Sequence, residues 1–189
     1  MSLFRKYCLS VLVFALVAVL PRDLLADKTY EVITPPACVN NLGETILFSL
    51  RSGGQGGVAA GMANRDADGR PVIFRMNYEK ASPAFQRFID YHECAHHQVG
   101  HVDQPHPPRN SYAHLMNESI ADCVAILRVR EEADYSYDAV IDGLVNAMTR
   151  VGFPKVSTDS RLRNIENCYK NYGSSAEFVA GALNSERTK

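Results

Sequence analysis

The sequence contains no tryptophan and no excess of either charge. Lysine and arginine number 20, against 21 aspartate and glutamate residues, so the formal net charge is -1. Without a basic excess, nucleic acid is not expected as a partner, and without a long acidic run the chain is not expected to be disordered. Because 46% of the residues are hydrophobic, the chain can form an ordinary globular core.

Long apolar runs are also missing, except near the amino terminus. Arg5 and Lys6 precede an almost wholly apolar run over residues 7–20, and the small residue Ala26 follows it. This order is typical of a secretory signal peptide, with cleavage expected after Ala26. An uncleaved membrane anchor is the alternative, although the run is short for a spanning helix. The sequence therefore predicts an exported protein, periplasmic or secreted, with no stable membrane span once residues 1–26 are removed.

Cysteine is scarce as well. Removal of the signal peptide would remove Cys8 and leave Cys38, Cys94, Cys123 and Cys168. An even number of cysteines in an exported protein predicts two disulfide bonds. Spacing alone permits three pairings, and unpaired buried thiols are the alternative.

Residues 27–189 are predicted to form a single domain, because no linker is long enough to separate two. The segment up to about residue 80 is rich in turns and short strand-like runs. The runs 58–63 and 71–77 flank the turn sequence NRDADGR and are candidates for a hairpin.

From residue 82 onward the pattern becomes helical. Ser82 is a plausible N-cap, with Pro83 at the first helical position, and this helix should end near Gly100. Further helices are expected at about 113–132, 137–150, 160–172 and 175–183. The predicted fold class is therefore α+β, with a small N-terminal β-sheet followed by a mainly helical body.

The first motif that carries chemistry lies on the helix after Ser82. The segment from His92 to His96 reads HECAH, an HExxH pattern. Residues four apart share one face of a helix, so both imidazoles can reach a single metal ion. Glu93 follows His92 directly and is placed to accept a proton from metal-activated water. A surface helix with incidental histidines is the alternative that HExxH alone leaves open.

A second motif follows 22 residues after His96, where residues 117–122 read NESIAD. This NExxAD segment resembles the second zinc-binding helix of the gluzincins, the thermolysin-like metallopeptidases. The resemblance covers about residues 72–132 and implies a zincin-like fold. It implies Zn²⁺ as the cofactor, held by His92, His96 and Glu118. It also implies that Asp122 holds a ligand imidazole, His92 being the candidate, in the way that carboxylates orient metal-bound histidines.

The resemblance has further implications for the surrounding structure. Gluzincins have an edge strand beside the HExxH helix that pairs with substrate, and the run 71–77 is the candidate here. If Asp122 reaches His92, the two helices cross closely. Their neighbours Cys94 and Cys123 could then form one disulfide, leaving Cys38 and Cys168 for the other.

The function implied is that of an exported zinc metallopeptidase acting on a peptide or protein substrate, with Glu93 as general base. A zinc-binding structural or interaction protein without turnover is the alternative, and hydrolysis of a non-peptide bond is a third hypothesis. No motif places the donor for the developing oxyanion, for which Tyr112, His114, Arg161 and Arg163 are candidates. The remaining histidines, His97, His101 and His106, are interpreted as structural or solvated.

Overall fold

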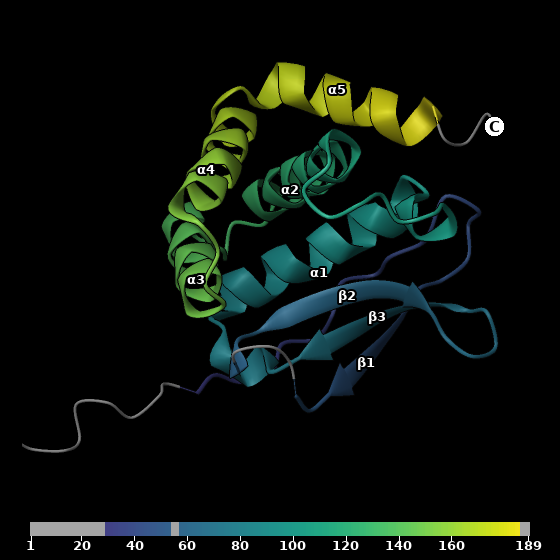
Figure 1. Ribbon diagram of the computed structural model, residues 1–189, viewed down its shortest axis with the longest axis horizontal. Coiled ribbons are helices and arrows are strands. Elements are labelled where there is room, and N and C mark those ends of the chain that lie inside the picture. Colours follow the sequence, from purple (N-terminus) through teal and green to yellow (C-terminus); the bar gives the residue numbers. More distant parts are fainter. Residues whose placement is uncertain (1–28, 54–56, 186–189) are drawn as a thin grey trace, which may run out of the picture.

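The computed structural model describes residues 29–53 and 57–185. The predicted signal peptide, residues 1–26, lies outside the described residues. Within them, a three-stranded sheet packs against a body that contains five α-helices (Figure 1). The α+β class predicted from the sequence is confirmed.

The sheet has the strand order β1-β3-β2, formed by Leu47–Arg51, Pro71–Met76 and Ala60–Arg65 respectively. Strands β2 and β3 form the antiparallel hairpin suggested by the runs around NRDADGR, with Arg65 paired to Pro71. Strand β1 pairs with the other side of β3 in parallel. The central strand β3 is buried over its first five residues, as a strand covered on both faces must be.

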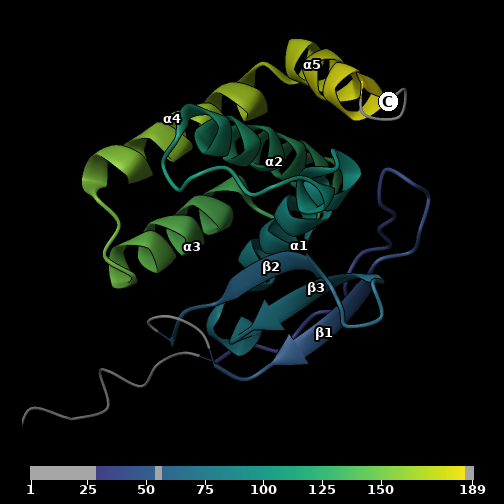
Figure 2. The same cartoon turned by 45° about the vertical axis from the view of Figure 1, so that its right-hand side comes forward.

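Helix α1 (Pro83–Gln98) lies between the sheet and the other helices (Figures 1 and 2). Its start is as predicted, because the Ser82 hydroxyl accepts a hydrogen bond from the Phe85 amide at 3.3 Å and proline occupies the first turn. Arg75 of β3 donates two hydrogen bonds of 3.0 Å to the buried carboxylate of Asp90. This ion pair fixes α1 against the sheet.

The other helices complete the body on the far side of α1. Two short 3-10 turns, η3 (Tyr78–Lys80) and η4 (His101–Asp103), flank α1. The remaining elements are α2 (Tyr112–Glu131), α3 (Tyr137–Arg150), α4 (Lys155–Lys170) and α5 (Tyr172–Ser185). Within the described ranges, none of the helices combines the length and apolar character needed to cross a membrane.

The prediction that residues 71–77 form the edge strand beside the HExxH helix is wrong. Strand β3, which covers the predicted run 71–77, has β1 on one side and β2 on the other. The strand that borders the HExxH residues is β2, because the amide of Ala63 donates to the carboxylate of Glu93 at 2.8 Å. The hairpin folds β2 back between β3 and the site, which proximity in sequence does not reveal.

Both disulfides are present, but the predicted pairing is wrong. Cys38 pairs with Cys94, with Cα atoms 6.2 Å apart, and Cys123 pairs with Cys168, with Cα atoms 5.5 Å apart. Each residue of a helix is rotated by about 100° from the preceding one. Although His92 and Asp122 face each other, Cys94 is therefore rotated about 200° from His92, toward the N-terminal segment. Cys123 is rotated toward α4 for the same reason.

Candidate metal centre

Three side chains from α1 and α2 bring metal-binding atoms to one point. Nε2 of His92 lies 3.2 Å from Nε2 of His96. The carboxylate oxygens of Glu118 lie 3.4 Å from Nε2 of His92 and 3.5 Å from Nε2 of His96. The helix period places His92 and His96 on one face of α1, and the packing of α2 on α1 brings Glu118 to that face. These three residues form a group that could hold a metal ion.

The spacing of these atoms suits a small tetrahedral ion. Nitrogen and oxygen ligands lie about 2.0–2.2 Å from zinc, so two ligand atoms of a tetrahedral site lie about 3.3–3.6 Å apart. The two imidazole nitrogens are 3.2 Å apart, close to that value, and each lies 3.4–3.5 Å from a different oxygen of the Glu118 carboxylate. A donor set of two imidazoles and one carboxylate also leaves a fourth position for water or substrate, as in catalytic zinc sites.

Asp122 lies behind His92 and fixes its ring. Oδ1 of Asp122 is 2.9 Å from Nδ1 of His92, so the other ring nitrogen, Nε2, faces Glu118 and His96. The guanidinium of Arg161, on α4, donates two hydrogen bonds to the same carboxylate, at 2.8 and 2.5 Å. Burial alone would raise the pKa of Asp122, but the charge of Arg161 and the contact with His92 hold it below its ordinary value. Asp122 is therefore ionised and can orient His92.

The charges around the ligand atoms keep Glu118 ionised as well. Burial alone would raise the pKa of Glu118, but the hydrogen bond and charge of His92, with smaller effects from His96 and Arg161, lower it. The two effects have opposite signs in His92, where burial alone would lower the pKa and the contacts with Asp122 and Glu118 raise it. Glu118 is therefore ionised beside His92.

Glu93 is held at the junction of α1 and β2. One of its carboxylate oxygens accepts the amide hydrogen of Ala63 at 2.8 Å. A Cβ atom at Gly61 would lie 2.3 Å from Cγ of Glu93 and 2.7 Å from a methyl of Ile89, so only glycine allows this close approach. Burial raises the pKa of Glu93 above its ordinary value. This is the change that favours a carboxylate acting as a proton acceptor near neutral pH.

Three cavities meet at the metal-ligand cluster of His92, His96 and Glu118, and one of them, of about 420 Å³, is lined by Glu118, His114 and Arg161. The smallest, of about 240 Å³, has the most polar lining of the three, and its walls include His92, His96, Glu118, Glu93 and His114. The largest, of about 490 Å³, is mainly apolar and extends from His92 and Glu93 toward Phe88, Leu144 and Met148. A metal ion at the cluster could therefore be reached by a ligand from the polar cavity and from the apolar one, both of which include Glu93 in their walls.

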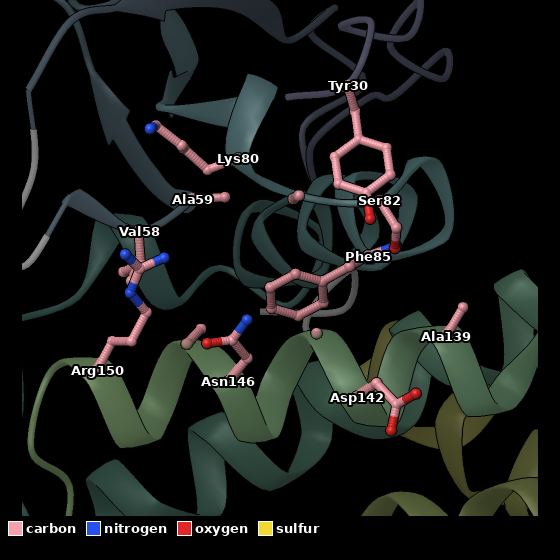
Figure 3. Close-up of a pocket in the computed structure, with 13 residues that line it drawn as sticks. Tyr30, Val58, Ala59, Lys80, Ser82, Phe85, Ala139, Asp142, Asn146 and Arg150 are labelled. Atoms are coloured by element: carbon pink, nitrogen blue, oxygen red, sulfur yellow. The ribbon is translucent and has the colours of Figure 1, made fainter. Parts of the chain in front are cut away.

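A further cavity, of about 230 Å³, lies along α3 and contains none of the predicted site residues. Figure 3 shows the Phe85 ring above α3, with Asp142, Asn146 and Arg150 presented by that helix and Lys80 and Tyr30 on the opposite side. This cavity shares four lining residues with the large apolar one, so the two are neighbours: Val58, Ala59, Phe85 and Ala147.

The candidate oxyanion donors are in different surroundings. His114 lines the polar cavity at the metal-ligand cluster, and its buried Nδ1 has no hydrogen-bond partner among the described atoms. Arg161 also lies at the site, but Asp122 engages its guanidinium. Tyr112 is 80% exposed, and neither it nor the exposed Arg163 lines the cavities at the cluster.

Sequence reasoning missed two contributions to the site. His101, interpreted as a solvated loop residue, places Nδ1 at 2.9 Å from Nδ1 of His96. Arg161, a candidate oxyanion donor by sequence, pairs with Asp122. Neither residue lies in a motif, so no local signal marks it. His97 is structural, as predicted: it is buried, and its Nε2 lies 3.1 Å from the carbonyl oxygen of Val72.

Comparison with known proteins gives no assignment: no family model, curated protein or solved structure matches the chain. The function must therefore be argued from the site itself.

Proposed function

We propose that this protein is an exported zinc-dependent metallopeptidase of the gluzincin type, with a zincin-like fold. The observation that carries the proposal is the convergence of His92, His96 and Glu118: their ligand atoms lie within 4.8 Å of one another, with the two imidazole nitrogens 3.2 Å apart. Glu93 lines the same cavity, as the HExxH motif requires of a general base. A purely structural zinc site would usually have four protein ligands, whereas this cluster has three.

In this proposal the chain holds the groups that hydrolysis needs. A bound zinc ion would supply Lewis acidity and lower the pKa of a water molecule. Glu93 accepts the proton of the attacking water and then passes it to the leaving amine. The Ala63 amide and the absent side chain at Gly61 fix the Glu93 carboxylate, so that its position is set before substrate arrives.

The substrate in this proposal is an extended peptide lying along β2. The outer edge of β2 faces the site, because the Ala63 amide points away from β3 and toward Glu93. Backbone groups on such an edge can pair with an added strand. The large cavity beside Glu93 is lined mainly by apolar side chains, including Phe88, Leu144 and Met148. An apolar substrate side chain next to the cleaved bond fits this lining.

His114 is the better candidate for the oxyanion donor. It lies one helical turn before Glu118 on α2 and lines the polar cavity together with Glu93. Among the described residues, Nδ1 of His114 has no hydrogen-bond partner, whereas the Arg161 guanidinium donates to Asp122. A donor without a protein partner can be directed at charge that develops during reaction.

Export is part of the proposal. Two disulfide bonds suit an oxidising compartment such as the periplasm or the extracellular space. Expression with and without residues 1–26, followed by N-terminal sequencing of the exported product, would test cleavage after Ala26.

The decisive experiment is hydrolysis of a diverse peptide library by the purified mature chain, with and without a chelator. We expect cleavage that the chelator abolishes and that added zinc restores. Glu93→Gln is the matched variant, because its amide oxygen can still accept the Ala63 hydrogen but cannot take a proton from water. It should keep zinc and fold, and lose hydrolysis.

Two results would contradict the proposal. Zinc binding without any peptide cleavage in the wild type would favour the alternative, a zinc-binding protein without turnover. Equal hydrolysis by wild type and Glu93→Gln would remove Glu93 from the mechanism.

A further inference from the structure

The two histidines of the HExxH motif have different partners on the side away from the metal-ligand cluster. Nδ1 of His92 faces the carboxylate of Asp122 at 2.9 Å. Nδ1 of His96 instead faces Nδ1 of His101 at 2.9 Å, with the two rings tilted by 55° and their centroids 5.1 Å apart. Each motif imidazole thus directs Nε2 at the cluster and Nδ1 at another side chain.

The chain brings His101 to His96 by a sharp reversal at the end of α1. Gly100 has φ of 71°, in the left-handed region that glycine adopts readily. The chain then enters η4, whose Asp103 forms two hydrogen bonds with Arg65 of β2, at 2.6 and 3.2 Å. The turn is therefore anchored at both ends, by the helix that carries His96 and by the strand that borders the site.

We propose that His101 is a positioning residue for His96, which rests on the proposed metal site. A neutral His101 that carries its proton on Nε2 can accept the Nδ1 hydrogen of His96. His96 is then fixed as the tautomer whose Nε2 lone pair points at the cluster. This is the role that Asp122 has for His92, filled here by a neutral ring instead of a carboxylate.

A neutral acceptor suits the charge balance of the cluster. Glu118 and Asp122 already place two carboxylates around the ligand atoms, and Arg161 is paired with Asp122. A third carboxylate, placed behind His96, would add negative charge beside Glu118. A neutral imidazole supplies the hydrogen-bond acceptor without that repulsion.

The test is zinc affinity of the full mature chain, measured by competition with a chromophoric chelator. His101→Leu removes the acceptor and should weaken zinc binding roughly 10–100-fold. His101→Asn places an amide oxygen near the position of Nδ1 and should recover most of the loss. His106→Leu is the matched control, because His106 is an exposed histidine of the same polar cavity; its affinity should match the wild type.

A second measurement separates positioning from a purely structural role. In the presence of excess chelator, His101→Leu and His101→Asn should unfold in urea at midpoints close to each other. The difference between them should appear only when zinc is present. A Co²⁺ absorption spectrum that changes in His101→Leu and returns in His101→Asn would support the same conclusion.

These measurements distinguish failure of the proposed metal site from failure of the role proposed for His101. If the wild type binds no zinc, the proposed function fails before His101 is tested. If the wild type binds zinc and His101→Leu binds it equally well, only the positioning role fails. Complete loss of zinc in both His101 variants would also overturn the inference, because it would make His101 a ligand itself.

Discussion

Arg161 and Asp122 form a two-bond ion pair between α4 and α2, with Nε 2.8 Å from Oδ2 and Nη2 2.5 Å from Oδ1. The same Asp122 oxygen that accepts from Nη2 lies 2.9 Å from Nδ1 of His92. The side chain of Asp122 is 1% exposed, so its charge depends on these two partners. The pair therefore links the packing of α4 to the orientation of a candidate metal ligand.

Removal of Arg161 should consequently affect both stability and metal binding. Arg161→Gln leaves a buried carboxylate without its cation, which should lower the free energy of unfolding by about 3 kcal/mol. Zinc affinity should fall roughly 10-fold, because Asp122 no longer holds His92 firmly. Arg163→Gln, an exposed arginine two positions later on α4, is the control and should leave both quantities unchanged. Equal behaviour of the two variants in urea unfolding and zinc titration would contradict this coupling.

We expect His92, His96 and Glu118 to hold the metal ion together. Mature protein should hold close to one zinc ion per chain by elemental analysis. His92→Ala, His96→Ala and Glu118→Ala should each lose it, because two remaining protein ligands bind weakly. His106→Ala should retain it. Full zinc content in Glu118→Ala, together with loss in His101→Ala, would show that the third ligand is misassigned.

Gly61 should be intolerant of any side chain. A methyl group there would lie 2.3 Å from Cγ of Glu93, so Gly61→Ala must displace the proposed general base or β2. We expect a loss of about 1–3 kcal/mol in stability and a fall in turnover. Gly181→Ala is the control: Gly181 lies in α5, and outside its chain neighbours and the backbone of its own helix no described atom comes within 4 Å of the added methyl, so the change should be neutral or slightly stabilising. Unchanged stability and kcat in Gly61→Ala would refute the close approach between β2 and α1.

The burial of His97 should make the free energy of unfolding depend on pH. It is 1% exposed, and its neutral Nε2–H donates to the Val72 carbonyl at 3.1 Å. Burial lowers its pKa below 6.5, so the unfolded chain takes up this proton before the folded chain does. The stability from a neutral His97 is therefore complete above about pH 6.5 and is lost as pH falls from there through the folded pKa.

The measurement is urea unfolding at about pH 7.5 and about pH 5, with chelator present so that metal binding does not contribute. His97→Gln keeps a donor but does not titrate in this range. The wild type should lose up to about 2 kcal/mol more than His97→Gln on acidification. The same acid sensitivity in both proteins would assign the effect to other groups.

Local sequence determined much of this protein. The spacing of HExxH places His92 and His96 on one face of α1, and the spacing of NExxAD places Glu118 and Asp122 on one face of α2, because both depend only on the helix period. The cap at Ser82 and the turn between β2 and β3 are equally local, and both were predicted. The α+β class followed from the same periodicities.

Only the tertiary structure decided the relationships that depend on how whole elements pack. The partners of Cys94 and Cys123 depend on which way each helix face points after packing, so reasoning from neighbouring residues gave the wrong pairing. The edge position of β2 depends on which side of β3 the parallel strand β1 joins. The contact between His101 and His96 depends on a left-handed Gly100 and on Arg65 from a distant strand. The disulfides and the Arg65–Asp103 contact join residues far apart in the chain, and they depend on how whole elements pack, so no local period encodes them.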